Sequence, residues 1–249
     1  MNILAIIPAR GGSKRIPYKN IKDFLGQPII KYTVDSAVES QIFDEVMVST
    51  DDPKVAKIAR EFGASIPFLR TKHNSSDMAT IADVITEVLE GYHQKGKEFD
   101  YFCCVLPAVP TISSKRIKLG LDLLRKEKAD AVLPLVKFDY PIQRALRIER
   151  ANVEMIEPKN ANVRSQDLEA TYHDAGRFYW ARTKSFLEQK TLFMRHMLPI
   201  IIPSWEVQDI DTPEDWKIAE IKYKIKEMIG EEQTSFYDAT DNKLIKVIE

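Results

Sequence analysis

The stretch that decides the fold is Asn2-Ile3-Leu4-Ala5-Ile6-Ile7, followed at once by Pro8-Ala9-Arg10-Gly11-Gly12-Ser13-Lys14-Arg15-Ile16-Pro17-Tyr18-Lys19-Asn20. The first part is a short apolar run, which predicts a buried strand. The second part is a glycine-containing loop that carries several Lys and Arg side chains. A strand that ends in such a loop is typical of an open α/β sheet, where ligands bind beyond the carboxyl ends of the strands.

The same alternation of apolar runs and helical patterns continues along the chain. Helices are predicted after Pro28, from Asp52-Pro53, over Thr80–Tyr92 and after Ser113, and strands over Val46–Ser49, Tyr101–Leu106 and Ala131–Val136. This βαβ order indicates a mainly parallel sheet covered by helices. We therefore expect a Rossmann-like α/β domain.

The alternation stops between residues 138 and 182, where short extended pieces are separated by polar stretches. We interpret this region as an inserted antiparallel element, and its aromatic residues favour a contact between two copies of the chain: Tyr140, Phe178 and Trp180. A strand at Leu198–Ile202 and a helix from Pro213 follow, the helix with one apolar face made by Ile218, Ile221, Ile225 and Met228. Residues 1–230 are thus expected to form one domain, and the tail over 231–249 shows no clear pattern.

Composition excludes several classes of protein. Lys and Arg together number 36 and Asp and Glu 37, so the summed charge gives no reason to expect nucleic acid or an anionic membrane as a partner. No apolar stretch is long enough to span a bilayer, and the apolar N-terminus is too short for a signal peptide. A cytoplasmic protein is the expectation.

The glycine loop has the composition of a phosphate-binding site. Gly11 and Gly12 allow backbone N–H groups to approach phosphate oxygens, and Ser13 offers a hydroxyl. The charge of a polyphosphate can be neutralised by Arg10, Lys14 and Lys19. The spacing fits neither a Walker loop nor a dinucleotide motif, so a triphosphate cradle of another kind is predicted. The alternative is a solvated basic loop with a glycine turn.

A second candidate site is Asp209-Ile210-Asp211-Thr212-Pro213. If this segment is extended, both carboxylates lie on one side and Ile210 on the other. Magnesium is commonly held by one or two carboxylates together with substrate phosphates, so these acids predict a Mg²⁺ site. The alternative is that they only complement the dipole of the helix, which we expect Thr212 to cap.

A third region combines polar and aromatic residues over Asn162–Asp167 and Tyr172–Tyr179. An Arg that grips a carboxylate with two hydrogen bonds suits an acidic sugar. An exposed hairpin with salt bridges is the alternative interpretation.

The loop Ile7-Pro8-Ala9-Arg10-Gly11-Gly12-Ser13-Lys14, with Pro17 and Lys19-Asn20, resembles the signature of the acylneuraminate cytidylyltransferases, or CMP-sugar synthetases. The resemblance extends through Val48–Asp52, Arg70, Asp77–Thr80, the Arg164 segment and Asp209–Thr212. It implies a nucleotidyltransferase fold of the GT-A-like type, CTP and a nonulosonic acid as substrates, Mg²⁺ as cofactor, and a homodimer formed through the inserted element.

The resemblance also implies roles for individual residues. The nucleotide is expected to contact Arg10, Gly11, Gly12, Ser13, Lys14, Lys19, Asn20, Arg70, Asp77 and Thr80. The sugar is expected to contact Leu106, Arg164, Gln166 and Asp174. The metal is assigned to Asp209 and Asp211, and the catalytic roles to Arg10, Lys19 and Asp211.

Two departures from the sialic acid members concern the sugar. Those members carry Gln-Pro-Thr-Ser-Pro after the central strand, where this chain has Leu106-Pro107-Ala108-Val109-Pro110, and their Asn-Gly is replaced by Asp174-Ala175-Gly176. Four segments resemble the branch that activates pseudaminic acid: Pro141–Leu146, Arg164–Leu168, Tyr172–Gly176 and Gln208–Trp216. Legionaminate, neuraminate and a ketodeoxyoctonate stay open as substrates. A catalytically silent nucleotide-binding module is disfavoured by the presence of Lys19 and of both acids.

Overall fold

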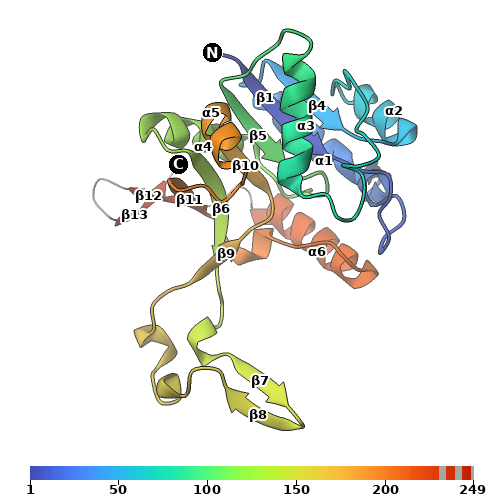
Figure 1. Ribbon diagram of the computed structural model, residues 1–249. Helices are drawn as coiled ribbons and strands as arrows, with labels where there is room; N and C mark the ends of the chain where they lie inside the picture. The colour runs from blue at the N-terminus through green and yellow to red at the C-terminus, as the bar shows by residue number, and fades with distance from the viewer. Residues whose placement is uncertain (230–233, 239–242, 248–249) are drawn as a thin grey trace.

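The computed structural model describes residues 1–229, 234–238 and 243–247. A mixed sheet forms its centre, in the order β13-β12-β11-β6-β10-β5-β1-β4, with β9 paired to β6 (Figure 1). Its strands are β1 (Ile3–Pro8), β4 (Glu45–Ser49), β5 (Tyr101–Val105), β6 (Ala131–Lys137), β9 (Tyr172–Asp174), β10 (Phe178–Arg182), β11 (Met197–Ile201), β12 (Thr234–Asp238) and β13 (Lys243–Val247).

Among the strands from β11 to β4, three of the five pairs are parallel. β1 pairs in parallel with β4 and with β5, and β6 does so with β11. β10 lies antiparallel between β5 and β6 and joins these two groups into one sheet. The predicted α/β class with a mostly parallel sheet is confirmed.

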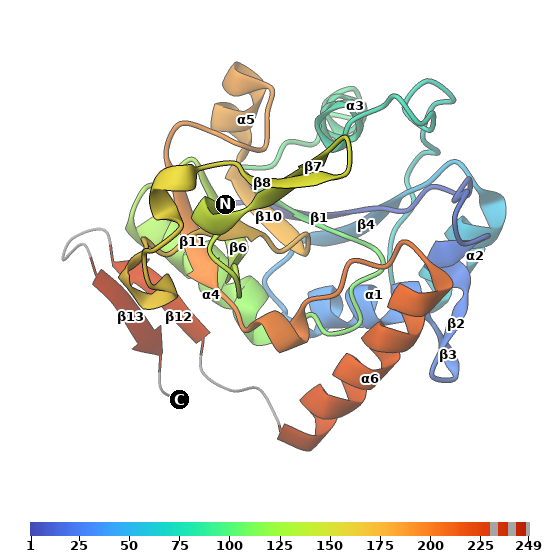
Figure 2. The same cartoon turned by 90° about the horizontal axis from the view of Figure 1, so that it is seen from below.

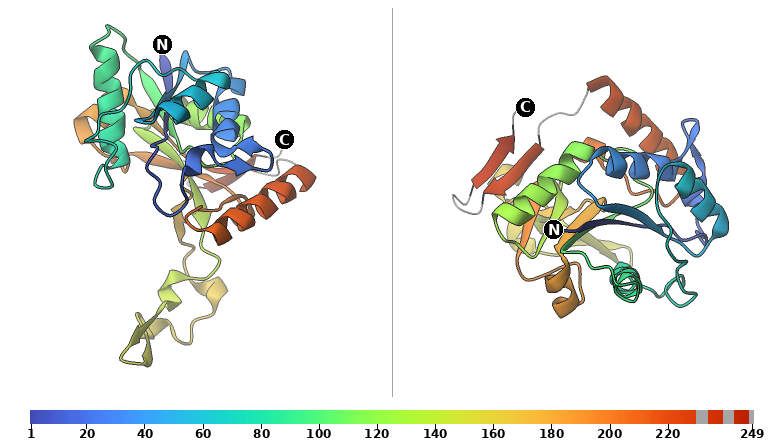
Figure 3. Two further views of the ribbon diagram at one scale, coloured as in Figure 1. Left: turned by 90° about the vertical axis from the view of Figure 1, so that its right-hand side faces the viewer. Right: turned by 90° about the horizontal axis from the view of Figure 1, so that it is seen from above.

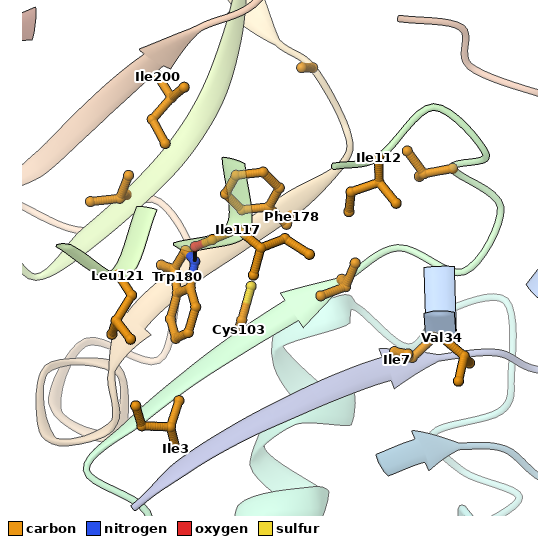
Figure 4. Close-up of a cluster of buried hydrophobic side chains, with 14 of the residues drawn as sticks. Ile3, Ile7, Val34, Cys103, Ile112, Ile117, Leu121, Phe178, Trp180 and Ile200 are labelled. Atoms are coloured by element: carbon orange, nitrogen blue, oxygen red, sulfur yellow. Dashed lines mark hydrogen bonds between the residues drawn. The ribbon is translucent and has the colours of Figure 1, made fainter. Parts of the chain in front are cut away.

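Helices cover both faces of the sheet (Figure 2). One face packs against α1 (Ile29–Glu39), α2 (Pro53–Glu61) and α4 (Ser114–Lys126), the other against α3 (Ile81–His93) and α5 (Thr183–Gln189). Successive residues of a strand point to opposite faces, so Ile3 and Ile7 join the first layer while Leu4 and Ile6 join the second. Figure 4 shows the first layer around the buried Trp180.

A third, smaller core fixes the end of the glycine loop against the last helix, α6 (Pro213–Ile229). It contains Ile16, Phe24, Ile29, Ile210, Trp216 and Ala219. Between the glycine loop and α1 the chain forms η1 (Lys19–Ile21) and the two-residue strands β2 (Asp23–Phe24) and β3 (Gln27–Pro28). This core therefore holds together the two regions that the sequence marks as candidate sites.

The buried face of α6 differs from the predicted one. Ile221 and Met228 are 59% and 85% exposed, whereas Trp216 and Ala219 are buried. The rings of Trp216 and Phe24 meet edge to face with their centroids 5.6 Å apart. Trp216 offers more apolar surface than an isoleucine, and its burial sets the rotation of the helix.

Residues 138–171 leave the sheet after β6, project from the body as an arm, and return at β9 (Figures 1 and 3). The arm contains η2 (Ile142–Arg144), β7 (Leu146–Glu149), β8 (Asn152–Met155), η3 (Pro158–Asn160) and η4 (Ser165–Asp167). An antiparallel insertion is thus present, but the predicted range of 138–182 is too long. Phe178 and Trp180 belong to β10 and are buried at the centre of the sheet, so they are not surface contacts. A short apolar run such as Phe178–Ala181 has the same pattern in a hairpin and in a buried antiparallel strand, which explains the error.

The tail also differs from the expectation. β12 and β13 form an antiparallel pair that extends the sheet beyond β11, with Ile200 opposite Phe236. Residues 230–233, 239–242 and 248–249 of the chain lie outside the described ranges. Within those ranges no helix is both long enough and apolar enough to cross a membrane.

Candidate active site

Two adjoining cavities open beyond the carboxyl ends of β1 and β5, and each has a volume of about 470 Å³. The basic cavity is lined by Pro8, Arg10, Ser13, Lys14, Arg15, Ile16, Lys19, Asn20, Asp77, Pro107 and Asp211. The apolar-walled cavity is lined by Lys19, Asn20, Leu106, Pro107, Ala108, Val109, His173, Asp174, Ala175, Gly176, Val207, Gln208, Asp209 and Ile210. These volumes suit small ligands, and the two cavities share Lys19, Asn20 and Pro107.

The cations of the basic cavity are held by two acids. Arg10 Nη1 lies 2.9 Å from Asp77 Oδ1, and Lys14 pairs with the other oxygen of the same carboxylate. Arg15 Nη1 lies 2.6 Å from Asp211 Oδ2, and Lys19 Nζ lies 3.7 Å from Asp211 Oδ1. The Lys14 ammonium, with Arg10, holds the pKa of Asp77 below its usual range. Four cations face two acids, so the lining has an excess of positive charge that suits a polyanion.

The glycine loop is shaped by the start of α2. Gly11 N donates to Asp51 Oδ1 at 3.0 Å, and a Cβ on Gly11 would come within 2.5 Å of Asp52 Oδ2. Gly11 is therefore required by the close approach of the two loops, and its N–H is engaged within the protein. A Cβ on Gly12 would meet nothing within 4 Å. Asp52 caps α2, accepting from Lys54 N at 2.7 Å.

Lys19 and Asn20 lie where the cavities meet. Lys19 Nζ donates to Ile210 O at 2.7 Å, which ties the loop to the Asp209–Asp211 segment. Asn20 is buried and donates through Nδ2 to Arg10 O at 3.0 Å. Its Oδ1 is buried and has no hydrogen-bond partner within the described residues. A buried amide oxygen normally has a donor, so this atom is suited to accept from a ligand N–H or O–H group.

Asp209 and Asp211 flank the buried Ile210. They were expected on one side of the segment, but Asp209 lines the apolar-walled cavity and Asp211 the basic cavity. The helix is capped without them, because Asp215 N donates to Thr212 Oγ1 at 3.1 Å while Asp215 Oδ2 accepts from Thr212 N at 2.8 Å. Two carboxylates beside a cavity with an excess of cations offer the oxygen ligands that Mg²⁺ prefers. No group of three or more His, Cys, Asp or Glu side chains suited to a metal occurs in the part of the chain that the structure describes, so substrate oxygens would complete the coordination.

The wall of the second cavity is apolar along Leu106, Ala108 and Val109, and polar at Asp174. The Asp174 carboxylate accepts from Gly176 N at 2.8 Å and from the Tyr179 hydroxyl at 2.5 Å. Burial and the bond to Asp174 raise the pKa of Tyr179, which keeps its hydroxyl a donor. The carboxylate is thus fixed at the cavity wall.

Comparison with known proteins gives the same assignment as the loop motif. Residues 4–237 match the sequence profile of a family described as Cytidylyltransferase. The chain belongs to this family. It is 40% identical over 226 residues to a pseudaminic acid cytidylyltransferase from Campylobacter jejuni, covering 90% of this chain and 97% of the relative. It is also 30% identical to a CMP-N,N'-diacetyllegionaminic acid synthase from Legionella pneumophila, over 88% of this chain and 95% of that one.

A solved structure supports the fold. The CMP:2-keto-3-deoxy-manno-octonic acid synthetase, determined with CTP, aligns with a TM-score of 0.65 at 17% identity, over 92% of this chain and all of that one. This likeness shows the α/β fold, and the family match together with the relatives shows that the chain is a CTP-dependent nucleotidyltransferase. The predicted family and enzyme class are confirmed.

Two residues predicted to contact the nucleotide, Arg70 and Thr80, line neither cavity of this cytidylyltransferase and bond to other residues of the protein. Arg70 is buried outside both cavities, and its Nε donates to Ser49 Oγ at 3.0 Å at the end of β4. Burial lowers the pKa of its guanidinium. Thr80 caps α3, accepting from Asp83 N at 3.1 Å. Both residues hold the segments that flank Asp77.

Two predicted sugar contacts, Arg164 and Gln166, lie exposed on the arm at η4, outside both cavities of their own chain. The assignment missed Arg15, which pairs with Asp211 across the basic cavity. The loop sequence contains this signal, since Arg15 directly follows Lys14. Its pairing depends on the approach of two segments almost 200 residues apart, which spacing along the chain does not reveal.

Proposed function

We propose that the enzyme transfers CMP from CTP to pseudaminic acid, a nonulosonic acid, and releases pyrophosphate. The observation that carries this proposal is the meeting of a basic cavity and an apolar-walled cavity at Lys19 and Asn20. A triphosphate matches the charge of the first, and an acidic sugar with apolar substituents matches the second. Their junction is where the α-phosphorus and the sugar hydroxyl would meet.

In the proposed reaction, the anomeric oxygen of the sugar forms a bond to the α-phosphorus, and its hydroxyl proton is released. The bond from the α-phosphorus to the bridging oxygen breaks, and pyrophosphate leaves with that electron pair. Arg10, Ser13 and Lys14 would hold the phosphates, with both cations exchanging Asp77 for phosphate oxygens. Lys19 would neutralise charge that develops at the junction, so catalysis is mainly positioning and electrostatic stabilisation.

The proposed cofactor is Mg²⁺, held by Asp209 and Asp211. When bound, the ion neutralises phosphate charge and lowers the pKa of an attacking hydroxyl. Because CTP and magnesium are available in the cytoplasm, we propose that compartment, which cell fractionation tests.

The sugar assignment rests on the cavity wall and on the relative from Campylobacter jejuni, whose name states pseudaminic acid. Leu106, Ala108 and Val109 replace the amide and hydroxyls of the sialic acid motif. Pseudaminate has an additional N-acyl group and a deoxy terminus in place of glycerol hydroxyls, so it leaves fewer hydroxyls unpaired against this wall. Unpaired polar groups lower affinity strongly, which is the basis of the discrimination.

The test is CTP-dependent pyrophosphate release with pseudaminate, legionaminate, neuraminate and a ketodeoxyoctonate. We expect the highest kcat/KM with pseudaminate. The triple variant Leu106→Gln, Ala108→Thr, Val109→Ser restores the sialic acid pattern, and we expect its preference to move toward neuraminate. A higher kcat/KM of the wild type with another acid contradicts the sugar assignment. If CTP binds but no pyrophosphate is released from it with any of the four acids, the silent nucleotide-binding module is favoured.

We further infer that the arm pairs two copies of the chain. On the β7–β8 hairpin, Leu146, Ile148 and Val153 lie on one face and are 60%, 79% and 64% exposed. Arg147 and Glu154 form an ion pair on the opposite face. An exposed apolar face of this kind suits a protein interface, and in such a pair Arg164 and Gln166 would have the cavities of the second copy as a possible binding site.

A further inference from the structure

A buried polar cluster lies next to the apolar-walled cavity. Arg116, Arg177 and Glu206 are all at least 95% buried. Arg116 grips the Glu206 carboxylate through both of its terminal nitrogens, one of them 2.6 Å from Oε1. Arg177 Nη1 donates to the Glu206 carbonyl at 2.5 Å, and its Nη2 donates to Thr111 Oγ1 at 2.8 Å. The Thr111 hydroxyl in turn donates to the Glu206 carbonyl at 2.6 Å.

The cluster joins three segments that are far apart in the sequence. Thr111 follows the wall residues Pro107–Val109, Arg177 follows His173–Gly176, and Glu206 precedes Val207–Ile210. Each of these segments lines the apolar-walled cavity. Leu106 N also donates to Arg177 O at 2.8 Å, so the backbone of Arg177 is bonded to the same wall.

None of the four residues lines either cavity, and of the three wall segments that they join only Pro107 also lines the basic cavity. The cluster is therefore placed to act on the apolar-walled cavity more than on the basic one. Burial lowers the pKa of Arg177 to about 9, which leaves its guanidinium charged at neutral pH.

Stability alone does not account for such a cluster. Charges removed from water are costly, and apolar residues of similar size often stabilise a core as well as a buried ion pair does. Hydrogen bonds depend on orientation, so each bond of the cluster fixes the position of one segment relative to another, which apolar packing alone does not do.

We propose that Thr111, Arg116, Arg177 and Glu206 form a positioning network that fixes the three walls of the sugar-acid site and so sets affinity for the sugar. This inference rests on the proposed function, because it assigns the sugar to the apolar-walled cavity. The four residues act through the walls and do not contact the substrate.

The test uses Thr111→Val, which removes the hydroxyl shared by Arg177 and Glu206 at nearly constant volume. Loss of one buried hydrogen bond corresponds to about a tenfold change in an equilibrium constant. We expect the KM for pseudaminate to rise about tenfold, while the KM for CTP changes less than about twofold. Thr111→Ser, which keeps the hydroxyl, is expected to retain the wild-type KM. Arg177→Lys, which keeps the charge but reaches fewer acceptors, is expected to repeat the effect of Thr111→Val.

Ser40→Ala is the matched control, since it removes a buried hydroxyl that bonds to Ala37 O at the end of α1, outside both cavities. It is expected to lower the melting temperature without changing either KM. Equal changes of both KM values in Thr111→Val and Arg177→Lys, or an unchanged sugar KM, overturn the inference. Absence of pyrophosphate release from the wild type with every acid overturns the proposed function instead, so the two failures are distinct.

Discussion

Lys19 lies at the junction of the two cavities, with its ammonium 2.7 Å from Ile210 O. A charge that stabilises the transition state contributes chiefly to kcat, so Lys19→Ala is expected to lose more turnover than CTP affinity. Removal of one such group costs about 100- to 1,000-fold in kcat. Steady-state kinetics with CTP as the varied substrate measures both quantities. Lys22→Ala is the control, because Lys22 lies in the same segment but lines neither cavity. An unchanged kcat with only weaker CTP binding removes Lys19 from the catalytic role.

Asp211 and Asp215 separate the metal role from the capping role. Asp211→Asn keeps the shape but removes a charge from the proposed Mg²⁺ site, so we expect turnover to fall at least about 100-fold with a nearly unchanged melting temperature. Asp215→Asn weakens the cap of α6 and is expected to show the reverse pattern. Magnesium titrations at saturating CTP, together with thermal melts, distinguish the two. Wild-type turnover and metal dependence in Asp211→Asn would make the acid pair structural.

At the scale of the element, the start of α6 should confer sensitivity to acid. Hydrogen bonds from Thr212 hold the pKa of Asp215 below its usual range. A carboxyl whose folded pKa is lowered contributes stability that is fully present above the unfolded value of about 4, and this stability is lost as the pH falls through the folded value. We expect the melting temperature to fall below about pH 4 in the wild type and less steeply in Asp215→Asn. Glu214→Gln, in the same turn, is the control, and it is expected to keep the wild-type slope. Equal slopes in all three proteins contradict the prediction.

The sequence predicts where strands and helices lie better than it predicts which of their faces are buried and which strands pair. Strands and helices that bury one continuous run or face, such as β1 and α3, lie where local patterns place them. The face of α6 could not be read from its isoleucines, because the position of Phe24 decides which side is covered. The predicted insertion was too long because it included β10. The partners of β10 in the main sheet lie 40 or more residues away in the sequence, and no local pattern indicates such pairing.

The same distinction holds for the site. The loop motif and the alternation of Asp209 and Asp211 gave cavity-lining residues, because their chemistry is contained in short segments. Arg70 and Thr80 carry motif signals but bond to Ser49 and Asp83. The pairing of Arg15 with Asp211 is a property of the tertiary structure alone.

At the scale of the whole molecule, the arm should be separable from the body. Phe138 N donates to Thr171 O at 3.0 Å, so a two-residue Asn-Gly turn can replace residues 139–170. We expect the shortened protein to fold with a similar melting temperature and to be a monomer, whereas the intact protein sediments as a dimer at micromolar concentration. A monomeric wild type, or a dimer that survives the excision, contradicts the assignment.

Point variants on the hairpin refine this test. Ile148→Lys places a charge on the apolar face and is expected to dissociate the dimer. Glu149→Lys, one residue on and on the opposite face, is the matched control and is expected to leave the dimer intact. Equal effects of the two substitutions would show that the hairpin's apolar face is not the interface.

The place of β10 has a consequence for synthesis on the ribosome. Along the sequence, β5 is followed by β6 as the next strand of the main sheet. The two strands are not neighbours in the sheet, because β10 lies between them. A nascent chain that has emerged only as far as Lys137 therefore holds β5 with one open edge and β6 with no partner strand, because β9, β10 and β11 all follow in the sequence. Open edges are sites of association between chains, and they persist here until Phe178–Arg182 leaves the exit tunnel. At about 5–20 residues per second, the 40-odd residues that include the arm extend this interval by several seconds. The length of the arm thus prolongs the time for which the edge of β5 is open to association with other chains.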